Sequence, residues 1–140
     1  MIYYAVIDTN VIVSALLKPD SIPGNVVNLI TIDKIVPIYN NKIEQEYKNV
    51  LARNKFNFPK EKQEDFFELL KFKGIKSDFK HTDEVFVDET DVVFYEVTLC
   101  FLCKTNNAYL ITGNIKHFPK KTFVVSPKEM IEIIKNNDNH

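Results

Sequence analysis

The chain has 140 residues, of which 45% are hydrophobic and 26% are charged, and its formal net charge is -1. This composition is typical of a globular protein, and residues 1–140 suit one domain that buries roughly two thirds of its unfolded surface. A net charge near zero excludes a molecule-wide positive field, so any nucleic-acid surface has to be a local patch. No apolar run approaches the roughly 20 residues of a membrane span, and no signal-type segment opens the chain. We therefore expect a cytoplasmic protein without a membrane partner.

An apolar run over residues 2–8 ends abruptly in a carboxylate, Asp8. A continuous run of β-branched and aromatic residues predicts a strand that is buried on both faces, as in a parallel sheet. Asp8 would then lie at the carboxyl end of this strand, where open α/β sheets bind their ligands. Because a carboxylate among apolar neighbours needs a partner, Asp8 is a candidate metal ligand.

The first half of the chain alternates between helical and strand patterns. It predicts helices over 10–17 and from the N-cap Ser21 to about 32, a strand over 35–39, and helices from Asn41 and from after Pro59 to Gly74. Within the strand, Pro37 indicates an edge position or a strand start.

The second half continues the alternation after an acidic, irregular stretch. It predicts a short strand over 85–87, a helix capped by Thr90, strands over 108–112 and 123–125, and a last helix opened by a capping box at Ser126 and Glu129. We expect residues 136–140 to fray. Strands that alternate with helices predict an α/β fold, with a parallel sheet covered by helices on both faces.

Two cysteines, Cys100 and Cys103, lie three residues apart in one predicted helix. This spacing does not favour a disulfide, and two thiols alone cannot complete a structural zinc site. We expect both to be small hydrophobic residues of the core.

Polar side chains follow the predicted strand ends or open the predicted helices at four places. They are Asp8, Glu44 with Glu46, Asp88 with Asp91, and Asn114 with His117. Each has an ordinary structural explanation as well: an acid in a first helical turn complements the helix dipole, Asn114 suits a turn, and His117 suits packing or the surface. Asp8 is the exception, because a strand-terminal carboxylate after an apolar run has few structural uses.

Carboxylates that face one another raise each other's pKa unless a cation neutralises them. Mg²⁺ prefers oxygen ligands and is usually held by one or two carboxylates, waters and substrate phosphate. Such a site could lower the pKa of a bound water and direct it at a phosphodiester.

The same residues form an ordered pattern along nearly the whole chain. The pattern is Asp8-Thr9-Asn10-Val11, Glu46-Tyr47 followed by Val50-Leu51, Asp88-x-x-Asp91, and the run from Ile111 through Asn114 and His117 to Pro119. It resembles the PIN-domain ribonucleases, in particular the small stand-alone PIN proteins classed as toxins of type II toxin–antitoxin pairs.

The resemblance implies a three-layer α/β/α sandwich around a parallel sheet, with an acidic pocket that binds one or two Mg²⁺ or Mn²⁺ ions and cleaves single-stranded RNA. Asp8, Glu46 and Asp91 take the first three acidic places of the family, with Glu44 as the competitor of Glu46. The fourth acid often stands where this chain has Asn114 or His117, neither of which is a carboxylate. Asp88 and Asn114 could supply further oxygen ligands.

Several residues near these positions are candidate substrate contacts. Thr9 could position Asp8 or a water, and Asn10 could orient Asp8 or, as we favour, cap the following helix. Candidate RNA contacts are His117, Lys116, Lys120, Lys121, Arg53 and Lys55.

The leading hypothesis is therefore a metal-dependent endoribonuclease, the toxin of a toxin–antitoxin pair, with single-stranded RNA as substrate and an antitoxin protein as partner. The Phe-rich helix between Lys60 and Lys73 suggests a homodimer. One alternative is a non-catalytic PIN-fold domain that binds RNA or protein. Another is a phosphoryl-transfer protein that uses a strand-one Asp, although no second Asp stands two residues after Asp8.

Overall fold

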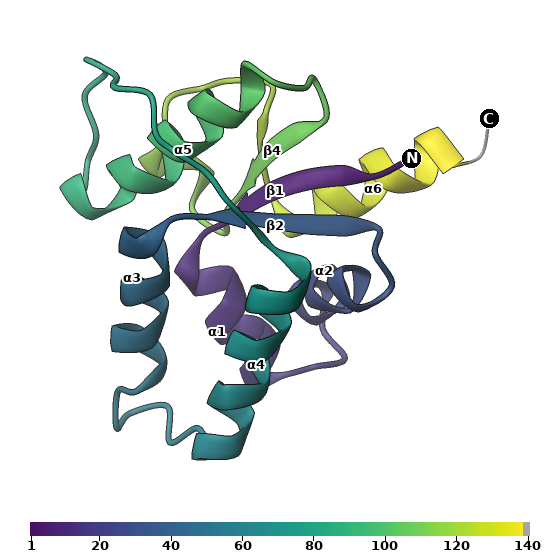
Figure 1. Cartoon of the computed structure of the whole chain (residues 1–140), viewed down its shortest axis with the longest axis vertical. Coiled ribbons are helices and arrows are strands. Elements are labelled where there is room, and N and C mark those ends of the chain that lie inside the picture. The colour runs from purple at the N-terminus through teal and green to yellow at the C-terminus, as the bar shows by residue number, and fades with distance from the viewer. Residues whose placement is uncertain (139–140) are drawn as a thin grey trace.

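The computed structural model describes residues 1–138, and in this part of the chain five parallel strands form one sheet in the order β3-β2-β1-β4-β5 (Figure 1). The strands are β1 (Tyr3–Ile7), β2 (Ile35–Tyr39), β3 (Ile75–Lys76), β4 (Ala108–Ile111) and β5 (Val124–Val125). The α-helices are α1 (Thr9–Leu17), α2 (Ile22–Thr31), α3 (Asn41–Leu51), α4 (Lys60–Lys73), α5 (Val92–Leu102) and α6 (Pro127–Asp138). Two short 3₁₀ helices are η1 (Glu89–Asp91) and η2 (Ile115–His117).

Helices cover both faces of the sheet. α5 packs on β1, β2 and β4 from one face, whereas α2 and α4 pack on β2 from the other, with α1 and α6 beside α2 (Figure 1). The prediction of a three-layer α/β/α sandwich with a parallel central sheet is confirmed. None of the helices within residues 1–138 is long and apolar enough to cross a membrane.

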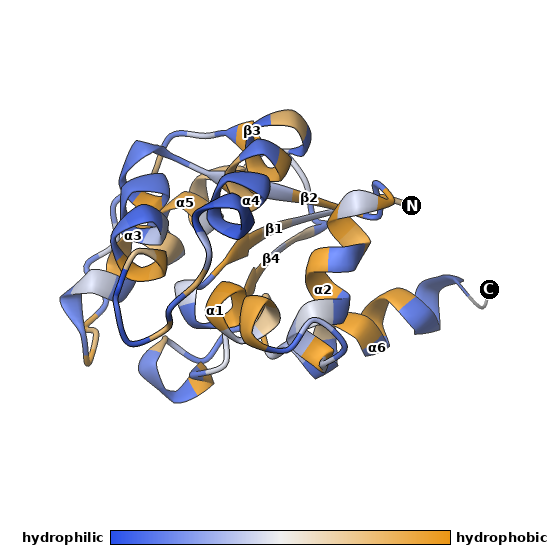
Figure 2. Cartoon of the chain, turned by 90° about the horizontal axis from the view of Figure 1, so that it is seen from below, coloured by the Kyte–Doolittle hydropathy of each residue, from blue (hydrophilic) through white to orange (hydrophobic). Residues whose placement is uncertain are grey.

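The core is centred on the two middle strands. At most 2% of the surface is exposed for Tyr3 and Ile7 of β1 and for Leu110 and Ile111 of β4. This burial explains why β1 is an unbroken apolar run. α1 is coloured mainly hydrophobic and α4 mainly hydrophilic (Figure 2). The difference follows from burial, because most residues of α1 are buried whereas α4 buries Phe66 and Leu70.

Several helix ends are confirmed residue by residue. The Ser21 hydroxyl caps α2 by accepting a hydrogen bond from the Gly24 backbone N–H at 3.1 Å. Ser126 and Glu129 form the reciprocal capping box of α6, with hydrogen bonds of 2.9 and 3.1 Å. α4 ends before Gly74, where an added Cβ would lie 2.5 Å from the carbonyl oxygen of Leu70.

The expectation for Pro37 is wrong, since β2 is an interior strand between β1 and β3. The pairing of β2 with β3 begins one residue later, with Ile38 opposite Ile75. The Pro37 carbonyl oxygen faces Gly74, the residue just before β3. Pro37, which has no N–H, therefore faces the third strand before its pairing with β2 begins. The proline therefore removes no hydrogen bond from the sheet.

The strand predicted over 85–87 is also wrong, because those residues have no strand partner. Phe86 is buried against the rings of Tyr95 and Phe118, while Val85 and Val87 are exposed. The alternation is real, but the segment lies over α5 instead of beside a strand. The edge strand β3 was missed, because two residues are too few to show a periodicity.

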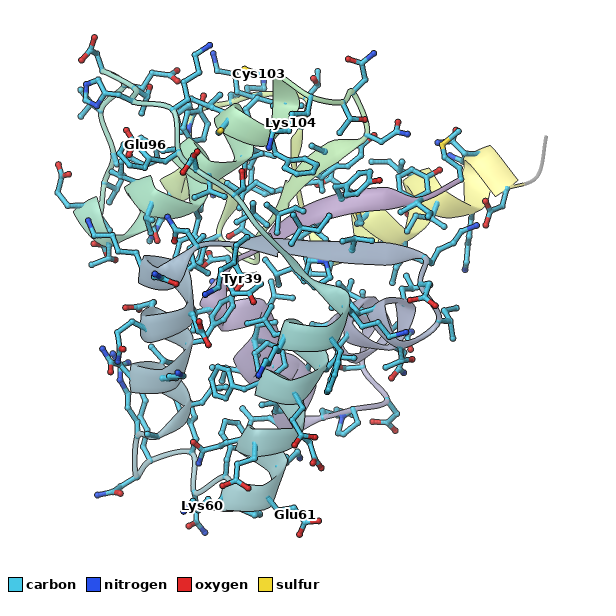
Figure 3. All side chains as sticks on the ribbon, in the orientation of Figure 1. Tyr39, Lys60, Glu61, Glu96, Cys103 and Lys104 are labelled. Atoms are coloured by element: carbon cyan, nitrogen blue, oxygen red, sulfur yellow. The ribbon has the colours of Figure 1, made fainter. Side chains whose placement is uncertain are left out.

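Two smaller expectations need correction. Cys103 lies exposed just after α5 (Figure 3) and Cys100 is half-buried, because the two cysteines share one side of the helix whereas the buried Phe101 lies on another. Residues 136–138 continue α6 instead of fraying, held by a Lys34–Asp138 ion pair of 2.9 Å. Residues 139–140 lie outside the part of the chain that the structure describes.

Candidate active site at the carboxyl edge of the sheet

The carboxyl ends of β1 and β4 lie side by side in the middle of the sheet. From β1 the chain passes through α1 and α2 to β2 on one side, and β4 is the neighbour of β1 on the other side. This is the point at which the strand order reverses, where open α/β sheets bind ligands. Asp8 is the first residue after β1, and Thr112 is the first residue after β4.

Asp8 is the buried acid of this edge, with 6% of its surface exposed. Its Oδ2 accepts a hydrogen bond of 2.7 Å from the Thr112 hydroxyl. Burial raises the pKa of the Asp8 carboxyl above its ordinary value, and the nearby Glu46 charge raises it further. The hydrogen bonds from Thr112 and the Thr9 backbone, together with His117, only partly offset this rise in pKa.

Thr112 has a role that sequence reasoning missed. It is fully buried, donates its hydroxyl proton to Asp8, and accepts a hydrogen bond of 2.9 Å from the Asn114 backbone N–H. It therefore fixes the Asp8 carboxylate and the turn after β4 at the same time. A threonine between a buried strand and a Gly-Asn turn was the available signal, but its partner lies 104 residues away in the sequence.

Asn10 lies on α1 next to this turn and does not cap a helix, so the capping role is wrong. Asp8 occupies the N-cap position of α1. The Asn10 side-chain oxygen instead accepts a hydrogen bond of 3.3 Å from the Gly113 backbone N–H. Asn10 thus ties the start of α1 to the turn after β4.

Asp88 and Asp91 reach the site from η1. Asp88 caps η1, since its Oδ1 accepts hydrogen bonds from the Thr90 backbone N–H at 3.0 Å and the Thr90 hydroxyl at 2.9 Å. These bonds lower the pKa of the exposed Asp88 carboxyl. The capping role predicted for Thr90 is wrong, because Asp88 caps η1 and Asp91 occupies the N-cap position of α5 without a side-chain hydrogen bond.

Asp91 has the opposite electrostatics. Burial, with the charges of Asp8 and Asp88, raises the pKa of Asp91 to about 6. His117 opposes the rise in pKa, with its Nδ1 lying 3.6 Å from Asp91 Oδ2. Asp91 and Asp8 are thus neighbouring carboxylates that each resist ionisation.

α3 contributes Glu46 to this edge, but it directs Glu44 elsewhere. Side chains two residues apart on a helix point in directions about 200° apart. The Glu46 charge acts on Asp8, whereas Glu44 pairs with Lys48 at 3.5 Å and adds to the effect of burial in raising the pKa of Tyr39. The Tyr47 hydroxyl donates to the Ile7 carbonyl oxygen at 2.5 Å, which fixes α3 beside the end of β1.

The predicted substrate contacts divide into two groups. Asn114 and the η2 residues Lys116 and His117 line a surface cavity of about 320 Å³, which His117 connects to Asp91. Lys120 is exposed shortly after η2, and Lys121 forms an ion pair of 3.4 Å with Glu84.

Arg53 and Lys55 belong to the second group, which the structure does not bring to this edge. They follow the far end of α3. α3 ends at Leu51, five residues or about 7.5 Å beyond Glu46 at 1.5 Å per residue, and Arg53 follows this end.

The donor set can be tested against a divalent cation. Within residues 1–138 no group of three or more His, Cys, Asp or Glu side chains lies close enough to hold a metal ion. The Asp8 and Asp91 carboxylates nevertheless fit one hard cation, because Mg²⁺ takes its remaining ligands from water and phosphate. Thr9 Oγ1, which is buried and has no hydrogen-bond partner among the described residues, is a further oxygen beside Asp8.

The parallel sheet and the acidic edge at its switch point define an α/β protein with a candidate ligand site at that edge. The sequence model of the PIN domain matches residues 4–116, and the chain therefore belongs to the PIN domain family. The resemblance to this family is confirmed. Comparison with curated proteins and with solved structures gave no match. PIN domains are generally nucleases and typically use divalent metals, so a hydrolase is the class of enzyme that the family supports.

Proposed function

We propose that the protein is a metal-dependent endoribonuclease that cleaves single-stranded RNA, with Asp8, Glu46 and Asp91 as its essential acids. The supporting observation is the pair formed by Asp8 and Asp91. Both have a raised pKa, and the charge of Asp8 contributes to the rise at Asp91. Keeping two such carboxylates together has a stability cost that a bound cation would remove.

The residues around the pair would divide the work. Asp8 and Asp91 would hold Mg²⁺ or Mn²⁺, with Asn114 as the candidate for a further oxygen ligand, whereas Asp88, which caps η1, would reach the cation only through water. A divalent cation there would lower the pKa of a water and neutralise charge on the phosphodiester. Thr112 would hold the Asp8 carboxylate in place, and Lys116, Lys120 and His117 would contact the RNA backbone.

The toxin role and the protein partners are part of this proposal. The resemblance to small stand-alone PIN toxins supports an antitoxin partner. A homodimer has weaker support, because α4 buries Phe66 and Leu70 in the chain's own core and leaves Phe72 exposed.

A non-catalytic PIN-fold domain that binds RNA or protein is the second candidate. Two observations favour it: Asn114 and His117 replace a carboxylate, and residues 1–138 contain no cluster of three metal-ligating side chains. Under this reading the acidic edge would bind no Mn²⁺.

The test is cleavage of a labelled, mixed-sequence single-stranded RNA by the full chain, with Mn²⁺ or with EDTA. Asp8→Asn is the test variant. Asp20→Asn is the matched control, because Asp20 is exposed beyond the far end of α1. We expect cleavage that requires Mn²⁺, is lost in Asp8→Asn by about 1,000-fold or more, and persists in Asp20→Asn. Cleavage that survives EDTA or Asp8→Asn would contradict the proposal. Absence of both cleavage and Mn²⁺-dependent stabilisation would favour the non-catalytic domain.

A further inference from the structure

A second cavity, of about 570 Å³, opens between α3 and α5 next to the acidic edge. Its lining includes Asn40 directly after β2, Lys42 and Glu46 on α3, and Val92 and Val93 on α5. Since Glu46 also acts on Asp8, this cavity borders the candidate active site.

Phe79 is the aromatic side chain of this cavity, and 61% of its surface is exposed. The backbone holds it from both sides. Ser77 N–H bonds to the Tyr39 carbonyl oxygen at 2.9 Å, and Lys80 N–H bonds to the Glu96 carbonyl oxygen at 2.9 Å. Phe79 is thus an exposed aromatic ring carried by an anchored segment that crosses from the sheet edge to α5 (Figure 1).

Glu96 reinforces this anchor. Its side chain accepts a hydrogen bond of 2.9 Å from the Thr82 backbone N–H, and it lies beside the crossing segment (Figure 3). Phe79 therefore lies between two backbone attachments, at Ser77 and at Lys80 to Thr82. The backbone that carries the ring therefore loses little conformational entropy when a flat ligand stacks on it.

The charges in the cavity limit which part of an RNA could enter it. Three carboxylates line the cavity, those of Glu46, Glu89 and Glu96, and Lys42 is the cation among its lining residues. Phosphates would be repelled from the carboxylates unless a cation or Lys42 lay between them. A nucleobase is neutral, and its N–H groups can donate to carboxylate oxygens. The cavity therefore suits a base better than a phosphate.

We propose that this cavity is a base-binding subsite, in which one nucleobase of single-stranded RNA stacks on Phe79 against Val92 and Val93. Lys42 contacts the adjoining phosphate at the rim. This inference rests on the proposed function, because it takes RNA as the substrate whose phosphodiester lies at Asp8 and Asp91. Base–aromatic stacking tolerates any sequence, because every base has a π-face.

The experiment measures binding without cleavage. Fluorescence anisotropy of a labelled single-stranded RNA in EDTA gives the Kd of the full chain and its variants. We expect Phe79→Ala to raise the Kd about 5- to 150-fold and Phe79→Tyr to stay within about twofold. Phe72→Ala is the matched control, because Phe72 is 80% exposed on α4 and is not part of the cavity.

Salt dependence separates stacking from general disruption of the fold. Phe79→Ala should leave the slope of log Kd against log salt unchanged, whereas Lys42→Ala should reduce it, because only the lysine neutralises a phosphate. Equal Kd values for Phe79→Ala and Phe72→Ala, or no measurable RNA binding by the native chain, would overturn the subsite. A Phe79 effect without metal-dependent cleavage would support the subsite and reject the nuclease, whereas cleavage without a Phe79 effect would do the reverse.

Discussion

Asp8 and Asp88 both occupy N-cap positions at the same edge of the sheet, but their surroundings shift the pKa of the two carboxyls in opposite directions. The Asp88 carboxylate caps η1, and its hydrogen bonds lower its pKa. The Asp8 carboxylate points across the sheet to Thr112, and burial raises its pKa. The difference shows that one acid stabilises its own local structure, whereas the other is held where ionisation is unfavourable. The second arrangement therefore gains more from a bound cation than the first.

Thr112→Val would break the arrangement around Asp8 without altering the surroundings of Asp88. Loss of the hydroxyl removes the Asp8 hydrogen bond and leaves the Asn114 N–H without its partner. Mn²⁺ affinity should fall about 10- to 100-fold, as is typical when a residue that orients a metal ligand is lost. Thr112→Ser should restore the affinity, which is measured from the Mn²⁺-dependent shift in Tm. Equal affinities for the Val variant and the native chain would mean that Thr112 only supports the fold.

Asn114→Asp would sharpen the comparison by adding a charge on the Asp8 side of the site. Carboxylates bind hard cations more tightly than amides, so we expect about tenfold tighter Mn²⁺ binding. Asn106→Asp makes the same charge change in the exposed loop before β4, at the opposite edge of the sheet. Similar affinities for the two variants would place Asn114 outside the range of the cation.

The raised pKa of Asp91 and the lowered pKa of Asp88 predict opposite effects of pH on the stability of the fold in the absence of metal. Asp91 has a pKa of about 6 in the folded state against 3.8 as its ordinary value. Its contribution to stability is therefore complete below the unfolded value and is lost as the pH rises through about 6. The lowered pKa of Asp88 has the opposite sign, because its contribution is lost only as the pH falls below its ordinary value. In EDTA, Tm should therefore be about 2–5 °C higher at pH 5 than at pH 7.

Asp91→Asn tests the cause of this pH effect. The variant should lose most of the rise in Tm on acidification, and it should be at least as stable as the native chain at pH 7. A loss of stability at pH 7 would instead mean that Asp91 serves mainly as a partner of the helix dipole.

The sequence predicted the parts of the fold that depend on local patterns. Asp8 could be singled out because an apolar run stops at it, and the capping box of α6 could be identified because four consecutive residues define it. Family membership also rested on local motifs that survive as ordered spacings along the chain.

The remaining features depend on which strands and helices become neighbours. The Thr112–Asp8 hydrogen bond requires β1 to pair with β4, a choice that neither segment specifies by itself. Asn10 was misassigned for the same reason, since its partner Gly113 lies across that pairing. Arg53 is basic and near Glu46 in sequence, but the length of α3 carries it away from the edge.

The most direct test of the cation site is isothermal titration of Mn²⁺ into the native chain, Asp8→Asn and Asp88→Asn. Asn retains the capping ability of Asp88, so this variant isolates the loss of charge. The account predicts binding by the native chain, affinity at least about 100-fold weaker in Asp8→Asn, and affinity within about threefold of native in Asp88→Asn. Native-like binding by Asp8→Asn, or an equal loss in both variants, would contradict the distinction between the two acids. Absence of binding by the native chain would contradict the cation site itself.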